Sequence, residues 1–411
     1  MAKDLSKIRT IVIVMMENRS FDHMLGYLAL PEYQHPNFAQ IDGLQNARAF
    51  YTHDAHPPRR LQGLSLDPDP PHEREDIARQ INDPLKGPMR GFVDSYSPAF
   101  EKYRAKSPNP RLTGVMEYCT ATEVYVTDFL ARSFAICDHW FAPLPASTLP
   151  NRLMAMSGYA LNDHTPDGVM QEIKNTMLFL EHRPDLVYDW LESKGHSWRI
   201  YSSGMPFFLQ VASMFARYES GNGQFREIEK LGEDALNDDL PDVAFVEPFY
   251  WCDPRKEGTA ASDDHAPASL AGGQRFLNIV RDAIVGPETI ARNKDLWDRL
   301  LMIVTYDEHG SFFDHVPPPK VPTKPEPPAS YPQFDTLGLR VPAIVISPFV
   351  KSGYVHKGVL DHTSILKFLG EKFGDGHYSD LVDNRGVGSL SDVLDSDLLA
   401  SSADIPDPPQ P

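Results

Sequence analysis

Residues 8–23 read IRTIVIVMMENRSFDH, and this stretch decides the fold class. The part up to Met16 is rich in β-branched residues and almost continuously apolar, which is the pattern of a strand covered on both faces. It ends abruptly at Glu17-Asn18-Arg19. Leu300–Tyr306 is a second apolar segment of this kind and is followed directly by Asp307-Glu308-His309. Buried strands with polar ends are typical of an α/β sheet, in which ligands bind beyond the carboxyl ends of the strands.

Further strand and helix patterns follow along the chain. A third apolar segment, Val341–Ile346, runs into Ser347-Pro348. Shorter strand patterns lie at 197–201 and 243–246, and apolar residues recur at helical spacing over 121–133, 274–284 and 364–373. Strands that alternate with helices predict parallel βαβ units. We therefore expect an α/β fold in which helices flank a central, mostly parallel sheet, with the polar strand ends gathered at one edge.

The charge composition of the chain argues against two classes of binding partner. The 411 residues include 39 Lys and Arg against 57 Asp and Glu, a formal net charge of −18. Nucleic acid and anionic membrane surfaces would repel such a chain, so neither is an expected partner. The apolar run Ile11–Met16 is far shorter than the roughly 18 residues of a transmembrane helix. No signal-peptide cleavage site follows it, which makes a cytoplasmic location the default expectation.

The prolines of the chain indicate its loops and domain organisation, and the cysteines indicate whether it has a disulfide framework. Proline accounts for 37 of 411 residues and gathers in Ala49–Pro71 and Pro317–Pro332, which predicts long surface loops. We expect a single domain over residues 1–400 with long proline-rich insertions, and a disordered tail over residues 401–411. The three cysteines are too few and too scattered for a disulfide framework, so we expect buried, inert thiols.

The residues that follow the two clearest predicted strands, 8–16 and 300–306, suggest a metal site. Four oxygen-bearing side chains follow these strands: Glu17, Asn18, Asp307 and Glu308. If the strands are neighbours, three carboxylates converge and require a counter-charge, which a divalent cation would supply. Oxygen donors suit Mg²⁺, Ca²⁺ and Mn²⁺, and carboxylates also bind Zn²⁺, so the identity of the ion stays open. The alternative is that the acidic pairs cap loops or form surface ion pairs.

The segment PASTLPNR over residues 145–152 suggests a phosphate-binding turn. A hydroxyl just before a helix lies among free backbone N–H groups, which bind phosphate oxygens well. Beside a cation, that hydroxyl would become a nucleophile. Arg152 would either grip a phosphate in bidentate fashion or pair with a carboxylate. An ordinary Ser or Thr N-cap is the alternative for the hydroxyl.

Most of the 15 histidines must be structural, but two lie in unusual surroundings. His72 follows DPDPP, whose rigid prolines would hold it in place. His265 lies in SDDHAP, where the carboxylates would fix its tautomer or hold the imidazolium. The remaining histidines beside the polar motifs are candidates for supporting side chains or helix caps: His23, His309, His315 and His362.

The residues 17–23, ENRSFDH, placed after an apolar strand, resemble the signature of the bacterial and plant phospholipase C and acid phosphatase family of phosphoesterases. This family is distantly related to alkaline phosphatase. The resemblance continues in the family's order at 70–72, 87–93, 147–152, 263–265, 305–316 and 361–363. Leu149 stands where many members carry a larger aromatic or imidazole side chain, and Ser311 replaces the second glycine of a His-Gly-Gly run.

The resemblance implies an alkaline phosphatase-like α/β sandwich and assigns roles. It makes Thr148 the nucleophile, and it makes His72 and His265 the residues that hold the phosphoryl group or protonate the leaving oxygen. One divalent metal ion would be bound by the four strand-end residues Glu17, Asn18, Asp307 and Glu308. We expect Arg152, Asn151 and Asp264 to bind the substrate.

The expected activity is that of a metal-dependent phosphoric ester hydrolase of the phospholipase C type, working through a phosphothreonine intermediate. Its substrate would be a phospholipid or a small phosphate ester. The alternative within the family is an acid phosphatase that acts on phosphomonoesters. A non-catalytic metal-binding protein and a glycoside hydrolase with a carboxylate pair are the alternatives outside it. Secreted relatives leave an extracellular location open, and oligomeric state is not assigned.

Overall fold

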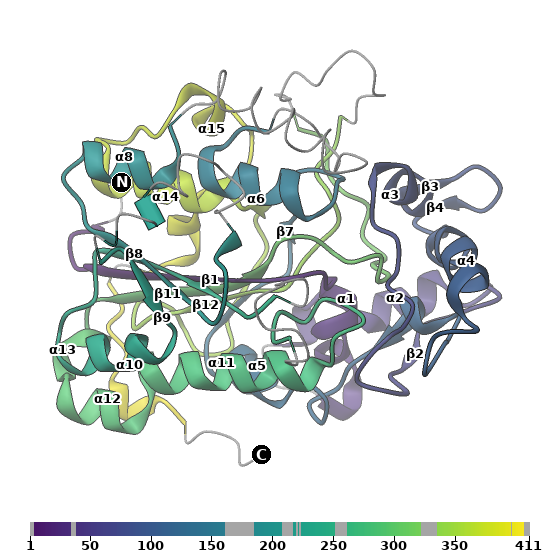
Figure 1. Ribbon diagram of the computed structural model, residues 1–411, viewed down its shortest axis with the longest axis horizontal. Coiled ribbons are helices and arrows are strands. Elements are labelled where there is room, and N and C mark those ends of the chain that lie inside the picture. Colours follow the sequence, from purple (N-terminus) through teal and green to yellow (C-terminus); the bar gives the residue numbers. More distant parts are fainter. Residues whose placement is uncertain are drawn as a thin grey trace.

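A central sheet organises the chain in the computed structural model, which describes residues 4–33, 38–160, 185–207, 217–218, 221, 223–250, 261–321, 335–395 and 397–406 (Figure 1). In this part of the chain eight strands form one sheet. Their spatial order is β13 (Val355–His356), β6 (Ala135–Cys137), β12 (Ala343–Ile346), β11 (Leu300–Tyr306), β1 (Thr10–Met16), β10 (Val243–Glu247), β8 (Trp198–Ser202) and β9 (Phe225–Glu227).

The central strand β1 pairs in parallel with β11 on one side and β10 on the other. Every residue of β1 and of β11 is buried, as the continuous apolar pattern predicts for strands covered on both faces. The parallel register places Val14 opposite Val304 and Met16 opposite Tyr306, so both strands end at the same level. The predicted α/β class and mostly parallel sheet are confirmed.

Strand β12 runs the other way. It pairs antiparallel with both β11 and β6, with Ile346 opposite Met302. Its carboxyl end therefore lies at the opposite edge of the sheet, where the Ser347 hydroxyl donates to the carbonyl of Leu300 at 2.7 Å. Our expectation that all three polar strand ends share one edge is wrong for Ser347-Pro348. A short apolar run carries no information about strand direction.

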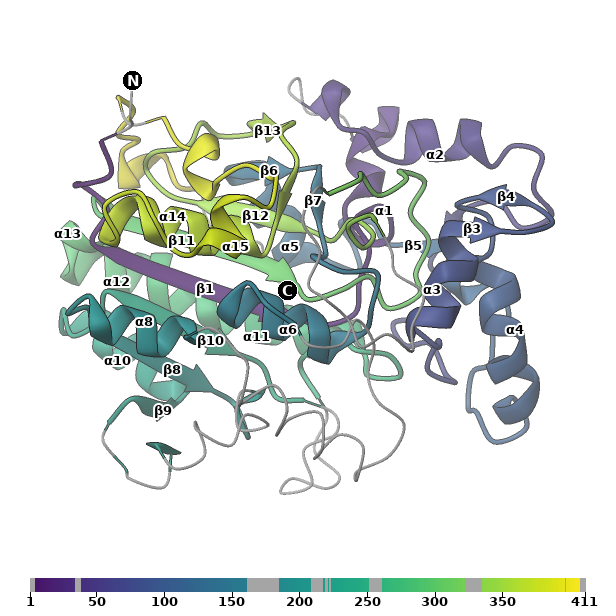
Figure 2. The same cartoon turned by 90° about the horizontal axis from the view of Figure 1, so that it is seen from above.

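Helices cover both faces of the sheet (Figures 1 and 2). One face carries α6 (Thr148–Ser157), α8 (Val187–Ser193) and α14 (Thr363–Phe373), and the other carries α5 (Tyr125–Ser133), α10 (Glu229–Leu236), α11 (Leu270–Val285), α12 (Pro287–Arg292) and α13 (Lys294–Trp297). The three predicted helices correspond to α5, α11 and α14 with small shifts at their ends. None of the described helices combines the length and apolar character that a membrane crossing requires.

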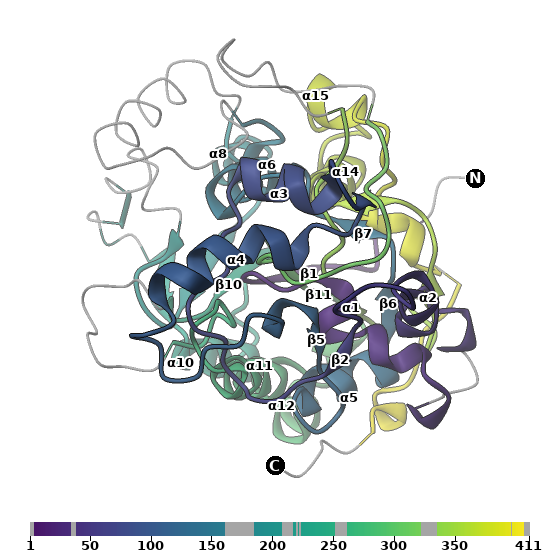
Figure 3. The same cartoon turned by 90° about the vertical axis from the view of Figure 1, so that its right-hand side faces the viewer.

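Further elements cover the end of the sheet toward which β1 and β11 point, which Figure 3 shows from that side. They include α1 (Phe21–Met24), α2 (Leu44–Phe50), α3 (Arg74–Ile81), α4 (Phe92–Tyr103) and the pair β3 (Asn82–Asp83) and β4 (Gly87–Pro88). Two other short pairs are β2 (Arg59–Arg60) with β5 (Glu117–Tyr118), and β7 (Trp140–Phe141) with β14 (Leu360–Asp361); α15 (Asp380–Asp383) follows α14.

The remaining predictions about organisation have mixed outcomes. Cys119 and Cys137 are buried and free, as expected, whereas Cys252 lies outside the described residues. Residues 322–332 of the second proline-rich segment lie outside them too. In the expected tail, Ser402–Asp404 forms a 3₁₀ turn and residues 407–411 are not described, so a disordered tail stays a prediction.

Candidate active site

The loops that follow β1 and β11 lie against each other. The backbone N–H of Asn18 donates to Asp307 Oδ1 at 3.1 Å, and that of Arg19 donates to the carbonyl of Glu308 at 3.0 Å. Asn18 has a φ of 59°, in the left-handed region that asparagine tolerates better than most residues. The predicted convergence of these two strand ends is therefore confirmed.

A glycine is required where the two loops touch. Gly310 has a φ of 61°, and a Cβ atom at this position would lie 2.2 Å from the carbonyl oxygen of Asn18. The next residue, Ser311, also has a positive φ, of 62°. Its hydroxyl donates to the carbonyl of Pro71 and accepts from Gln80 Nε2 at 2.6 Å. The serine at this position therefore ties the loop to the segment that carries His72.

Arg152 pairs with the strand-end carboxylates. Its Nε donates to Asp307 Oδ2 at 3.2 Å, its Nη2 lies 3.4 Å from Glu17 Oε1, and its Nη1 donates to the hydroxyl of Tyr250 at 3.0 Å. The guanidinium also packs 4.9 Å from the centre of the Phe207 ring. All three nitrogens are thus engaged by the protein. Arg152 thus supplies counter-charge to the carboxylates, which is the alternative that the sequence left open, and its role in substrate binding stays a prediction.

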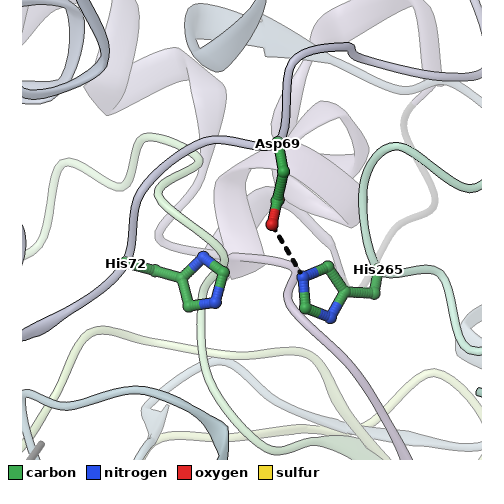
Figure 4. Close-up of side chains that lie close together, drawn as sticks. All are labelled: Asp69, His72 and His265. Carbon is green, nitrogen blue, oxygen red and sulfur yellow. Dashed lines mark hydrogen bonds and ion pairs between the residues drawn. The ribbon is translucent and has the colours of Figure 1, made fainter. Parts of the chain in front are cut away.

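Asp69, His72 and His265 form a compact polar group at the same place (Figure 4). Their facing ligand atoms all lie within 4.8 Å of one another, and His265 Nε2 lies 3.3 Å from Asp69 Oδ2. Asn18 Nδ2 lies 3.2 Å from His72 Nε2 and 3.1 Å from His265 Nε2. The two predicted histidines, more than 190 residues apart in the sequence, thus meet at Asn18.

The other nitrogen of each ring is held by the protein. His72 Nδ1 lies 2.7 Å from the carbonyl of Pro70, and His265 Nδ1 lies 2.8 Å from Glu17 Oε2. Burial disfavours the imidazolium, but the carboxylates of Asp69 and Glu17 outweigh burial and raise the pKa of His265 well above its usual value. Sequence reasoning missed Asp69. Its position between two prolines, next to His72, is the signal that was available.

Thr148 is the first residue of α6 and faces Asn18. Its hydroxyl donates to Asn18 Oδ1 at 3.3 Å, which brings the predicted nucleophile to the same asparagine as both histidines. Ser147 is the N-cap residue, and its side chain makes no capping hydrogen bond within the described part of the chain. The start of α6, the positive end of its helix dipole, therefore lies at this site.

Asn151 shapes the turn before α6. Its Oδ1 accepts from the backbone N–H of Leu144 at 2.9 Å, and its Nδ2 donates to the carbonyls of Ala146 at 2.7 Å and Ser147 at 3.0 Å. The side chain is fully buried and occupied by these bonds. Asn151 thus holds the backbone that presents Thr148, and its expected role in substrate binding stays a prediction.

Two histidines support the acidic pair after β11. His362 Nε2 donates to the carbonyl of Asp307 at 2.8 Å while its Nδ1 accepts from Trp140 Nε1, and burial lowers the pKa of His362 to about 4, so its ring is neutral at pH 7. His309 Nδ1 lies 3.2 Å from Glu308 Oε2. The expectation that these histidines are supporting side chains agrees with their contacts.

The oxygen donors fit a hard divalent cation in their chemistry. Glu308 is fully buried, and its Oε1 has no hydrogen-bond partner among the described residues. Burial raises the pKa of Asp307. However, groups of three His, Cys, Asp or Glu ligand atoms within 4.8 Å occur at two places in the described chain, and neither contains Glu17, Asp307 or Glu308. These three carboxylates converge on one region, with Arg152 between two of them, without forming a compact ligand set.

Asp264 lies beneath the site and not within it. Its side chain is fully buried, and its Oδ2 accepts from the hydroxyl of Tyr306 at 2.7 Å. Its backbone carbonyl accepts from Arg19 Nε at 2.8 Å, which anchors the loop before His265. Burial raises the pKa of Asp264 to about 6. Asp264 thus supports the loop before His265, and its expected contact with substrate stays a prediction.

Asp264→Asn is expected to make the protein more stable at pH 7. The folded state holds the Asp264 proton more tightly than the unfolded chain, so this group costs stability as the pH rises from about 4 to about 6. The neutral amide removes that cost, which is about 1–3 kcal/mol. Urea unfolding at pH 4.5 and pH 7 measures it. If Asp264→Asn is less stable than the parent at pH 7 and its free energy of unfolding has the same pH dependence, the raised pKa of Asp264 is contradicted.

A mostly apolar cavity of about 50 Å³ lies behind Arg152, between the sheet and helices α6, α8 and α14. It is lined by Ile13, Met15, Arg152, Ala155, Met156, Val187, Tyr188, Phe207, Phe245, Val246, Glu247, Ile365, Leu366 and Leu369. Phe207 and Tyr250 come from two aromatic segments, residues 206–208 and 249–251, of which Phe208 and Trp251 lie outside the described residues.

Comparison with known proteins identifies the family. A model of the Phosphoesterase family matches residues 8–374. The chain belongs to the Phosphoesterase family. The match includes the loops that follow β1 and β11, Thr148 and the two histidines, so the predicted family resemblance is confirmed over nearly the whole described chain.

Curated relatives within this range are phospholipases C. The chain is 32% identical to non-specific phospholipase C1 of Arabidopsis thaliana over 367 residues, which are 85% of this chain and 62% of that protein. It is 29% identical to phospholipase C A of Mycobacterium tuberculosis, over 90% of this chain and 74% of that protein. The chain thus spans less than two thirds of the length of the plant relative.

Solved structures show only a distant likeness. A protein in the alkaline phosphatase superfamily from Vibrio parahaemolyticus aligns with 65% of this chain at a TM-score of 0.35 and 14% identity. The phosphonate monoester hydrolase of Agrobacterium radiobacter covers 94% of this chain at a TM-score of 0.39 and 11% identity. At such scores the sheet itself, and not the likeness, establishes the α/β fold.

Proposed function

We propose that this protein is a phosphoric ester hydrolase of the phospholipase C type with Thr148 as its nucleophile. The observation that carries the proposal is the meeting of three groups at Asn18. The Thr148 hydroxyl approaches from the start of α6, and His72 and His265 approach from two loops on the other side. A hydroxyl at a helix N-terminus opposite two histidines is suited to in-line attack on a phosphorus atom.

The phosphoryl group would be held between these elements. Backbone N–H groups at the start of α6 would bind phosphoryl oxygens, and His72 would bind a further one. In the first step Thr148 Oγ1, its proton lost to solvent, forms a bond to phosphorus while the bond to the leaving oxygen breaks. In the second step water attacks phosphorus, the bond from phosphorus to Thr148 Oγ1 breaks, and Thr148 regains a proton from solvent.

His265 is suited to protonate the leaving oxygen. Its ring lies between the carboxylates of Glu17 and Asp69, which raise its pKa and so keep it protonated at neutral pH. General acid catalysis of this kind contributes about 10²–10⁴-fold to the rate. In the second step the same ring would accept a proton from the attacking water.

A divalent cation belongs to the proposal. Glu17, Asn18, Asp307 and Glu308 would hold it, with the unpaired Oε1 of Glu308 as the donor that most needs a positive partner. When bound, such an ion polarises the phosphoryl group and stabilises a deprotonated hydroxyl. Arg152, already paired with Glu17 and Asp307, reduces the negative charge that the ion has to balance. Ca²⁺, Mg²⁺, Mn²⁺ and Zn²⁺ remain the candidates.

The names of the relatives support the substrate class. Proteins 29–32% identical to this chain carry the name phospholipase C. Cleavage on the glycerol side of a phosphodiester would release diacylglycerol and a phosphorylated head group.

A substrate comparison tests the proposal. We expect kcat/KM for a short-chain phosphatidylcholine to exceed that for p-nitrophenyl phosphate at both acid and neutral pH, with diacylglycerol and phosphocholine as products. The preparation of Thr148→Ala, purified in the same way, serves as the blank for contaminating phosphatases. The opposite preference, strongest at acid pH, would make the protein an acid phosphatase instead.

A further inference from the structure

A buried ion cluster lies beyond the candidate site, on the same two loops. It consists of Asp22, Asp314, His315 and Arg340, and its first three members belong to the motifs SFDH and FFDH that follow the ligand-bearing residues. The side chains of Asp22, Asp314 and Arg340 are completely buried, and His315 is 7% exposed. None of the four has a role in the proposed reaction.

Arg340 joins the two loops through the carboxylates. Its Nη2 donates to Asp22 Oδ1 at 3.2 Å and its Nε donates to Asp314 Oδ1 at 2.9 Å. Its Nη1 donates to the backbone carbonyls of Asp42 at 2.7 Å and Asp138 at 2.9 Å. Each guanidinium nitrogen is therefore used, and the arginine is anchored to backbone outside the two loops.

His315 closes the cluster. Its Nδ1 donates to Asp22 Oδ2 at 2.6 Å and its Nε2 to Asp42 Oδ1 at 2.9 Å. Burial opposes the charged ring, but the carboxylates of Asp22 and Asp42 prevail and raise the pKa of His315 to about 10. The cluster thus balances the charges of Asp22, Asp314 and Asp42 largely with Arg340 and a protonated His315.

A ladder of hydrogen bonds connects this cluster to the candidate cation site. Beyond the contacts of Asn18 and Arg19 with Asp307 and Glu308, the Ser20 hydroxyl donates to the carbonyl of Phe313 at 2.6 Å. The ladder ends in the cluster, where the backbone N–H of Asp22 donates to Asp314 Oδ2 at 3.2 Å and that of His315 donates to Asp22 Oδ2 at 2.9 Å. The two loops are therefore joined at both ends, and a shift at one end moves the other.

Stability alone does not account for such a cluster. Replacing buried ion pairs by well-packed apolar side chains is often neutral or stabilising, because desolvation costs as much as the attraction returns. What a fully bonded charged group does provide is a single geometry. We propose that Asp22, Asp314, His315 and Arg340 are positioning residues that hold the loop of Glu17 and Asn18 against the loop of Asp307 and Glu308, and thereby set the affinity for the divalent cation. The inference rests on the proposed cation site.

Asp314→Asn tests the inference against a matched control. The control is Asp234→Asn, which removes a carboxylate that is 3% exposed and accepts from Arg199 Nη1 at 3.1 Å and Arg226 Nη1 at 2.7 Å. Asp234 lies in α10, beside the sheet edge formed by β8 and β9, and its partners among the described residues belong to neither loop. Both variants neutralise a buried carboxylate that pairs with arginine.

The readout is binding of Mn²⁺ alone, measured by electron paramagnetic resonance without substrate. We expect the Kd for Mn²⁺ to rise about 10- to 100-fold in Asp314→Asn, the usual effect of removing a side chain that orients metal ligands, and to stay within about threefold of the parent in Asp234→Asn. Amide hydrogen exchange should accelerate in peptides covering 17–23 and 307–316 for Asp314→Asn only. Saturating Mn²⁺ should restore its kcat, because the reacting groups are intact.

The inference would be overturned if Asp314→Asn and Asp234→Asn bind Mn²⁺ with equal affinity and amide hydrogen exchange in the two loops is unchanged in both. That outcome would leave the proposed function in place. A parent protein that binds no divalent cation would overturn the cation part of the proposed function and this inference with it. If Asp314→Asn does not fold, His315→Asn takes its place. That variant keeps a donor toward Asp22 and loses the contact with Asp42, so a smaller rise in the Mn²⁺ Kd is expected, and no rise would overturn the inference.

Discussion

Thr148→Ala is expected to reduce kcat about 10⁴- to 10⁶-fold, the range seen when a catalytic nucleophile is removed. The loss follows from the proposed covalent step, since alanine keeps the start of α6 and removes the attacking oxygen. The fold should be retained, because the hydroxyl makes one long hydrogen bond of 3.3 Å, to Asn18. Initial rates on the preferred ester and the thermal melting temperature measure the two effects.

The neighbouring hydroxyl provides the control. Ser147 precedes α6, and its Oγ donates to Glu73 Oε2 at 3.2 Å, away from Asn18. Ser147→Ala is expected to retain activity within about tenfold, in line with the loss of one hydrogen bond. An acid-quenched reaction of the parent should carry one phosphoryl group on the peptide that contains Thr148. Near-normal turnover by Thr148→Ala would refute the nucleophile assignment. Equal losses of activity in Thr148→Ala and Ser147→Ala would indicate that the reaction needs the intact first turn of α6 and not the Thr148 hydroxyl in particular.

Asp307→Asn is expected to lose both bound cation and activity. Asp307 Oδ1 accepts from two backbone N–H groups, those of Asn18 and Glu308, and the oxygen of an asparagine would keep these contacts. The amide nitrogen would face Arg152 in place of a carboxylate oxygen, which removes the negative charge needed by a cation. Loss of the several kcal/mol that a metal ion contributes predicts a rate reduction of about 10³-fold or more.

Metal analysis after dialysis, together with initial rates, measures both effects of Asp307→Asn. Asp264→Asn is the matched control, because it makes the same isosteric change at a fully buried carboxylate that bonds Tyr306. It should retain the bound metal. Unchanged metal content and activity in Asp307→Asn would exclude Asp307 as a ligand, and a parent that is free of metal and insensitive to chelators would exclude the cation altogether.

Much of the scaffold was predictable because its signals are local. β1 and β11 match predicted segments within two residues, since a strand buried on both faces must be apolar along its whole length. Their polar ends were equally visible. The family motifs then singled out Thr148, His72 and His265, and the structure brings all three to Asn18.

The roles of individual polar side chains were less predictable. Asn151 and Arg152 are neighbours in the sequence, within the motif that contains Thr148, yet Arg152 pairs with carboxylates and Asn151 bonds the backbone of its own turn. Asp69 was overlooked because its position between two prolines is a weak signal, which does not show that its side chain meets His265. Its relation to His265 depends on two loops that meet only in the folded chain.

By itself, the sequence determined the α/β class, the two central strands and the residue types at their ends, because apolar periodicity and motif order are properties of the chain read one segment at a time. Only the tertiary structure decided the direction of β12, the pairing of Arg152 with Glu17 and Asp307, and the joining by Arg340 of the loops that follow β1 and β11. Each of these depends on which distant segments come into contact, and buried charges take the partners that the folded backbone brings within reach.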